Sequence, residues 1–210
     1  TAQIDRMQRN LRLGGEYMFN EATWLEASVS MTTLDYDDGE RYGYLDYDYL
    51  TPGLRIVHQF NPKTQIFGIL SHAKVEYDSD TELESKTDSL QLGTAYDISA
   101  TWKVSASVGT RRTRTSSLTP ILVAPIPGLE PFCGFFFECQ IVYVPTDSES
   151  TGLVYDAALT REFETGSLRL SASQSVTPSS TGTDTESTRV SLDGTHRFDA
   201  KLSAGLAVSY

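Results

Sequence analysis

The chain of 210 residues lacks any long run of apolar residues, and this excludes a membrane-spanning helix, which needs about 18 of them. Basic residues are also scarce. There are 17 Lys and Arg against 28 Asp and Glu, and the net charge of -11 disfavours nucleic acid as a partner. With only 3 histidines and 2 cysteines, the chain has few residues that bind transition metals. Its apolar content of 39% is below that of a typical soluble domain.

What the chain does have is a regular alternation of apolar and polar residues. In the closing stretch, Leu202, Ala204, Leu206, Val208 and Tyr210 alternate with small or polar residues. The same period of two recurs at residues 10–19, 25–32, 54–60, 67–77, 89–98, 102–109, 153–163, 168–176, 189–198 and 202–210. Because successive side chains of a β-strand point to opposite faces, the alternation predicts about ten strands and an all-β fold.

The connections between these segments are alternately short and long. The short ones read FNEATW, FNPKTQ, DISATW, FETGSL and FDAKLS, and the long ones are LDYDDGERYGYLDYD, EYDSDTELESKTD, residues 116–148 and TPSSTGTDTEST. This pattern of connection lengths is typical of consecutive antiparallel hairpins that have all their long loops at one end. The organisation predicts a single up-and-down sheet over residues 1–210.

Two kinds of protein can use such a sheet. In a soluble sandwich the apolar face points inward, and strands are usually about five or six residues long. In a membrane barrel the apolar face meets lipid and the polar face meets a wet lumen, over strands of about ten residues. The alternating segments have the longer length, and only a closed barrel satisfies every backbone polar group in hydrocarbon. We therefore predict a transmembrane antiparallel β-barrel.

The aromatic residues support the barrel. Those in the apolar phase gather beside the short turns, as the belt at a membrane interface does: Tyr17, Phe19, Phe60, Phe67, Tyr96, Trp102, Phe163 and Phe198. A second, tyrosine-rich group lies toward the long loops: Tyr36, Tyr42, Tyr44, Tyr47, Tyr49 and Tyr77. Trp24 is out of phase and remains unassigned.

The polar phase carries charges of both signs and amides, which a wet lumen tolerates. The predicted lumen-lining residues are Arg12, Glu16, Glu26, Arg55, Gln59, His72, Lys74, Gln91, Lys103, Arg111, Asp156, Glu162, Arg169 and Arg197. Because Arg and Lys are mixed with Asp and Glu, we expect weak ion selectivity. The small hydroxyl residues between them suit a path for sugars, although small residues are also what fits a lumen.

Two features of the sequence are similar to those of a known family. One is the repeated turn of an aromatic residue, Asn or Asp, two further residues and Thr-Trp, and the other is the stretch DYDYLTPGLRIVHQF before a hairpin. The chain resembles Gram-negative outer-membrane β-barrel porins, and is most similar to the barrels associated with exopolysaccharide export and PEP-CTERM systems. The resemblance covers essentially the whole chain, but it rests on general features of the sequence and not on a diagnostic motif. It implies a pore in the bacterial outer membrane for solutes or secreted polysaccharide, surrounded by lipid and lipopolysaccharide.

The two ends of the chain suggest an interior piece of a larger barrel. The first strand runs into a short turn and the last one leaves a short turn, so both ends are expected on the long-loop side. Outer-membrane barrels normally keep both ends in the periplasm. The ending LAVSY argues the other way, because it is similar to the aromatic signal at the end of such barrels.

Residues 116–148 are predicted to be a long Pro- and Phe-rich loop. It contains CGFFFEC, whose Cys133 and Cys139 are spaced for a disulfide in an oxidising compartment. Such an apolar loop is unusual in full exposure. It can constrict the lumen, cap the mouth, dock a protein partner or pack on its own barrel rim, and the sequence leaves these alternatives open.

Three functions are compatible with these features. A pore or export channel is the main prediction, with no catalytic residue, metal or cofactor. The alternative is a non-conducting scaffold for a protein partner such as an electron-transfer cytochrome, although the chain has no CxxCH motif of its own. The least favoured is an outer-membrane hydrolase using His72 beside the acidic residues Asp35, Asp37, Asp38, Asp78 and Asp80, whose spacing matches no motif.

Overall fold

The computed structural model describes residues 5–37, 43–79, 82–123, 140–178, 184–199 and 202–210. All regular structure in them is β-strand: β1 (Arg6–Asn20), β2 (Thr23–Tyr36), β3 (Tyr47–Asn61), β4 (Thr64–Tyr77), β5 (Glu84–Asp97), β6 (Trp102–Val123), β7 (Gln140–Phe163), β8 (Gly166–Pro178), β9 (Asp184–Arg197) and β10 (Ser203–Ser209). Within these described residues, no helix is long and apolar enough to cross a membrane.

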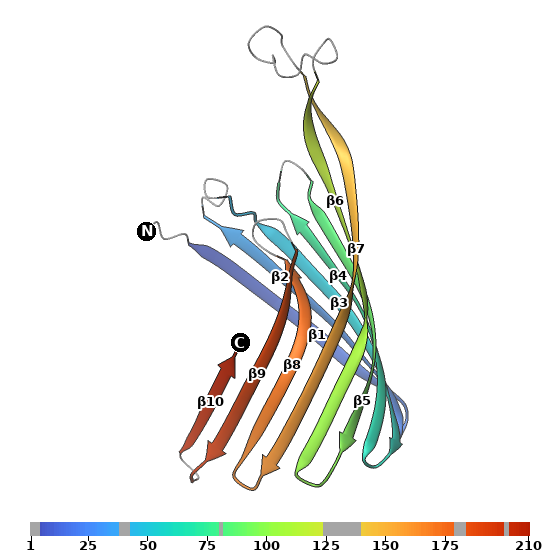
Figure 1. The fold of residues 1–210 in the computed structure, drawn as a ribbon, viewed down its shortest axis with the longest axis vertical. Helices are drawn as coiled ribbons and strands as arrows, with labels where there is room; N and C mark the ends of the chain where they lie inside the picture. The colour runs from blue at the N-terminus through green and yellow to red at the C-terminus, as the bar shows by residue number, and fades with distance from the viewer. Residues whose placement is uncertain (1–4, 38–42, 80–81, 124–139, 179–183, 200–201) are drawn as a thin grey trace.

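The strands form one curved sheet in sequence order, and every neighbouring pair is antiparallel (Figure 1). The prediction of ten antiparallel up-and-down strands is therefore confirmed. Over the part of the chain that the structure describes, β1 pairs only with β2 and β10 pairs only with β9. The sheet is thus an open, strongly bent wall with two free edges.

The two faces of this wall differ in exposure and chemistry. On β5, Leu90, Leu92 and Tyr96 are exposed, whereas Gln91 and Ala95 between them are half-buried. Side chains on the inside of a bent sheet converge and shield one another, so the exposed apolar side chains mark the convex face. The polar phase lies on the concave face, which is the arrangement of a membrane barrel and the reverse of a soluble core.

Asparagine side chains close the short turns after β1 and β3. The Asn20 carboxamide accepts a hydrogen bond from the Ala22 backbone N–H at 2.9 Å, and Asn61 accepts one from Lys63 at 2.9 Å. Each is an Asx turn, in which the side chain imitates a backbone carbonyl and reverses the chain within two residues. The repeated Phe-Asn of the sequence therefore marks where strands end.

Strands β6 and β7 are longer than the others, with 22 and 24 residues, and project beyond the rest of the sheet (Figure 1). The prediction of a loop over 116–148 is wrong at both ends, because β6 continues to Val123 and β7 begins at Gln140. Pro120 and Pro145, which suggested a loop, lie within these strands. A two-stranded ribbon with free edges tolerates proline, which cannot donate a ladder hydrogen bond.

The phase predicted for β4 is also wrong. Leu54 pairs with Leu70 and Ile56 with Gly68, so the even-numbered residues of β4 share the convex face. Phe67, predicted at the membrane interface, lies on the concave face and is 7% exposed. Strand β4 has apolar residues in both phases, so its own alternation does not decide which residues face outward, and the pairing with β3 decides it. A phase that is assigned one residue off exchanges the faces of every side chain in the strand.

Phe67 occupies space that only a glycine leaves on the next strand. A Cβ added at Gly93 would lie 2.5 Å from two atoms of the Phe67 ring and 2.7 Å from the Ala106 carbonyl oxygen. We expect Gly93→Ala to lower the free energy of unfolding by about 1–3 kcal/mol through overpacking. Denaturant unfolding in lipid vesicles measures this. Gly68→Ala is the control, since its nearest contacts would be at 3.6 Å. Equal stability of the two variants would contradict the packing described.

Candidate functional site

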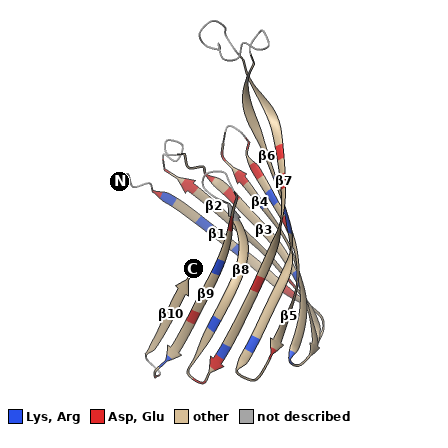
Figure 2. Cartoon of the chain, in the orientation of Figure 1, with Lys and Arg blue, Asp and Glu red and all other residues tan. Residues whose placement is uncertain are grey.

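The concave face is a wall of hydroxyls, amides and paired charges, and it is the candidate site. All predicted lumen residues except His72 and Lys74 lie on it: Arg12, Glu16, Glu26, Arg55, Gln59, Gln91, Lys103, Arg111, Asp156, Glu162, Arg169 and Arg197. Charges of both signs are spread over the strands (Figure 2). His72 and Lys74 lie on the convex face because of the changed phase of β4.

Neighbouring strands are joined across this face by hydroxyl pairs. Ser71 and Ser89 lie 2.6 Å apart, and Thr87 and Thr113 are 2.9 Å apart. Further along the wall, Ser171 and Ser191 are separated by 2.8 Å. Such pairs satisfy part of the hydrogen-bonding capacity of each hydroxyl and leave the rest for water or a solute.

Near the short turns, an ion pair and aromatic rings form a cluster on β2, β3 and β4. Arg55 donates to both Glu26 oxygens, at 3.1 and 3.0 Å, and its guanidinium carbon lies 4.4 Å from the centre of the Phe67 ring. Trp24, unassigned from the sequence, donates to Glu26 at 2.9 Å and covers this end of the wall with Val57, which is fully buried. The charges here are thus compensated, and they rest on a small apolar patch.

The tyrosine-rich group belongs mainly to the concave face. Leu34 pairs with Tyr47, which pairs with Tyr77, and the rings of Tyr47 and Tyr77 are 5.8 Å apart. Tyr36 stacks on Tyr44 at 5.2 Å. Tyr47 and Tyr77 therefore pack on one another inside the curved sheet and not on its outer surface. Tyr42 lies outside the described residues.

The β8–β9 hairpin leaves the wall partway along its length. Strand β7 pairs with β8 only from Phe163 with Gly166 to Asp156 with Ser173, although both strands continue. Beyond Ser173 the hairpin turns toward the concave face, where Glu186 forms an ion pair with Arg111 of β6.

Because of this bend, residues of the convex phase in the outer part of the hairpin face the concave side of the sheet. Val176, which the alternation places with the convex residues, lines a cavity on the concave face together with Gln174. The Gln174 amide also donates to Glu186. No local signal indicates this change, because the two strands keep their alternation while the hairpin as a whole tilts inward.

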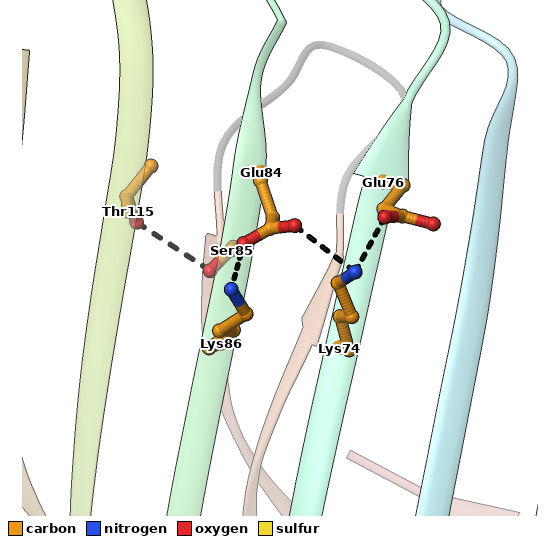
Figure 3. A network of polar contacts seen from close by, with 6 residues as sticks. All are labelled: Lys74, Glu76, Glu84, Ser85, Lys86 and Thr115. Carbon is orange, nitrogen blue, oxygen red and sulfur yellow. Dashed lines mark hydrogen bonds and ion pairs between the residues drawn. The ribbon is translucent and has the colours of Figure 1, made fainter. Parts of the chain in front are cut away.

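On the convex face, an apolar band is bounded by charged residues on the long-loop side. On β3 the band runs from Phe60 to Leu50, about the length that a tilted strand needs to cross hydrocarbon. Beyond it lies a charged cluster, in which Lys74 contacts Glu76 at 2.5 Å and Glu84 at 3.1 Å, and Lys86 contacts Glu84 (Figure 3). Hydrogen bonds from Lys86 and Lys74 hold the pKa of Glu84 below its ordinary value.

Most predicted interface aromatics are found beside the short turns. Tyr17, Tyr96, Trp102 and Phe163 lie on the convex face, while Phe19, Phe60 and Phe198 are exposed at or just beyond the strand ends. Arg161 was not predicted at this interface, but its guanidinium carbon lies 5.0 Å from the Trp102 ring and 4.7 Å from the Phe163 ring. The sequence does indicate its place, because Arg161 is in the same alternating phase as Leu159 and Phe163 and lies close to a short turn.

The histidines contact neighbours other than those considered for hydrolysis. His72 lies 2.7 Å from Asp88 on the convex face, and Asp35 lies 3.7 Å from Arg9. His58 and His196 each face a threonine hydroxyl. Within the described ranges no group of three or more His, Cys, Asp and Glu is placed to hold a metal ion. Asp38, Asp80, Cys133 and Cys139 lie outside the described residues, so the disulfide remains a prediction.

Comparison with known proteins places the fold. No protein-family model matches the chain, and no curated protein is similar in sequence. Among solved structures, the ferric-catecholate import receptor Fiu of E. coli K12 in its closed form is similar with 10% identity and a TM-score of 0.55, over 98% of this chain and 40% of the receptor. The chain thus spans about two fifths of that receptor's length.

Two further structures have the same architecture. The toluene transporter TodX of Pseudomonas putida is similar with 12% identity and a TM-score of 0.53, over 98% of this chain and 64% of TodX. The translocator domain of the autotransporter NalP of Neisseria meningitidis is similar with 13% identity and a TM-score of 0.50, over 99% and 74%. At these identities the likeness concerns the fold alone. The chain is an all-β, up-and-down sheet with the fold of outer-membrane β-barrels.

Proposed function

We propose that this chain forms the wall of a channel in the bacterial outer membrane, through which polar solutes pass passively. The observation that carries the proposal is the reversed polarity of the sheet, with exposed leucines on the convex face and hydroxyls and paired charges on the concave face. Water fills a lumen lined in this way and leaves a path for solutes. The sequence resemblance extends the proposal to secreted polysaccharide, whereas the inward hairpin favours small solutes.

Conductance of the purified protein in planar lipid bilayers tests this function. Stable, reproducible current steps are expected. Absence of current at all voltages, together with a protein partner that co-purifies, would contradict the channel and support the scaffold.

One feature favours the scaffold as a second candidate. The projecting β6–β7 ribbon exposes Ile121, Val123, Ile141 and Tyr143, and exposed apolar ribbons are docking surfaces for other proteins.

The charge on the wall predicts how selectivity responds to mutation. Glu26→Gln removes the partner of Arg55 and leaves an uncompensated positive charge beside the path. We expect the permeability ratio to shift toward anions by about twofold to fivefold, since one such charge is worth roughly 0.5–1 kcal/mol in a wet pore. The reversal potential in a salt gradient measures the shift. Glu149→Gln, on the convex face, is the control and should leave the potential unchanged.

The charged cluster on the convex face supports a lipid partner for the same channel. Lys74 and Lys86 lie just beyond the apolar band, together with Arg112, which donates to Glu149 at 2.7 and 2.6 Å. Long-loop ends of outer-membrane barrels face the outside. In this orientation the cluster lies at the level of lipid and lipopolysaccharide headgroups, whose phosphates accept hydrogen bonds from Lys and Arg.

A further inference from the structure

A cavity of about 210 Å³ lies between the inward part of the β8–β9 hairpin and the concave face of β3–β7. Its walls are built from strands far apart in the sheet order, since Tyr49 of β3 and Val176 of β8 both line it. They come together only because the hairpin leaves β7 at Ser173 and tilts inward. The volume would hold roughly seven water molecules.

Two residues that line this cavity each have a buried side-chain polar atom with no hydrogen-bond partner among the described residues. These atoms are the hydroxyl oxygen of Thr51 and Nε of Arg111. The Arg111 side chain is only 10% exposed, and its Nη2 contacts Glu186, which leaves the Nε–H free. A buried donor without a partner costs free energy, so both atoms favour a bound molecule that offers oxygen atoms.

Gly152 makes room for the guanidinium at this position. It faces Arg111 across β6 and β7, and a Cβ there would lie 2.9 Å from Nη2. The guanidinium therefore lies close against the backbone of β7, with its planar edge held in place. Such a fixed donor is suited to recognition, because little side-chain freedom is lost when a ligand binds.

The remaining lining defines the chemistry of the ligand. Ser71, Ser89, Thr87, Gln91 and Gln174 supply hydroxyls and amides. The charge of Arg111 is balanced by Glu186, so the cavity has no net charge. Ala73, Val75, Val154 and Val176 add apolar contacts. A small, uncharged molecule with many hydroxyls and a partly apolar ring matches this lining.

We propose that the cavity is a saturable binding site for a single sugar ring or a polyol of similar size. The site rests on the proposed channel function, because it lies on the wall of the lumen. It goes beyond a passive path, since the solute is bound by Thr51 and Arg111 on its way.

Binding of D-glucose to the detergent-solubilised protein tests the proposal, measured by saturation-transfer NMR without reference to conductance. Thr51→Val keeps the shape of the side chain and removes its hydroxyl, so we expect about fivefold weaker binding. Thr110→Val is the matched control on the convex face, and should bind as the unaltered protein does. Arg111→Lys keeps the charge beside Glu186 but removes Nε–H, and about tenfold weaker binding is expected.

The outcomes separate this site from the channel. Absence of glucose binding, or equal binding by the Thr51→Val and Thr110→Val variants, overturns the site even if the protein conducts. Stronger binding of gluconate than of glucose also overturns it, because Arg111 would then recognise a carboxylate in place of Glu186. Glucose binding that saturates and weakens in both variants supports it, and a protein that binds glucose without conducting would contradict the channel alone.

Discussion

Glu186→Gln is expected to raise the single-channel conductance in planar bilayers. Glu186 is the residue that holds the inward β8–β9 hairpin to β6, through its ion pair with Arg111. Beyond Ser173 this hairpin has no ladder with β7 to keep it in place. Without the charge on residue 186, the hairpin can move toward the plane of the wall and widen the path.

The size of this effect follows from the exposure of the two side chains. Arg111 is 10% exposed and Glu186 is 51% exposed, so solvent screens one side of the pair. We therefore expect a loss of about 1–2 kcal/mol, between the values of exposed and buried pairs. A change of about 1.4 kcal/mol alters the ratio of held to released hairpins tenfold.

Glu162→Gln is the matched control for this experiment. Glu162 contacts Lys103 at 3.0 Å, both side chains are half exposed, and both lie on the concave face. This pair joins two strands that are already joined by a ladder, so its loss should leave the conductance almost unchanged. Equal conductance of the Glu186→Gln variant and the unaltered protein would show that the ion pair does not hold the hairpin.

Leu92→Arg is expected to destabilise the protein in a bilayer by about 2–4 kcal/mol. Leu92 lies in the middle of β5 on the convex face and is 66% exposed. If this face meets hydrocarbon, the arginine has to bring its charge into lipid, and this cost is greatest near the midplane. Denaturant unfolding in lipid vesicles, followed by circular dichroism, measures the change.

Ala95→Arg, three residues along the same strand, provides the comparison. Ala95 lies on the concave face and lines a cavity of about 350 Å³ with Lys103 and Arg169, where an added guanidinium meets water. The free energy of unfolding of the Ala95→Arg variant should differ little from that of the unaltered protein. A larger loss for Ala95→Arg than for Leu92→Arg would show that the concave face is the dry one, and the channel would be lost with it.

Much of the fold could be predicted because its determinants are local. In β5, Leu90 and Leu92 alternate with Gln91 in one phase only, so the sequence identifies the convex side without any partner strand. The paired turns at Asn20 and Asn61 carry their own hydrogen-bonding side chains, and these mark the strand ends. The strand number, the antiparallel order and most of the concave residues follow from such signals.

Where both phases of a strand are apolar, alternation no longer decides the face. Ile66 and Phe67 are both apolar in β4, and the pairing of Leu54 with Leu70 places His72 and Lys74 on the convex side. Proline likewise hid the continuation of β6 through Pro120. These differences arise from register, which depends on how two strands meet and not on either strand alone.

The sequence by itself determined which residues of each strand share a face, because the alternation of side chains is a property of the strand's own backbone. Only the tertiary structure decided the route of the β8–β9 hairpin and the meeting of Arg111 with Glu186, which lie 75 residues apart in the sequence. That contact depends on the accumulated bend of the sheet and on the point where a ladder stops, and no short stretch of residues encodes either.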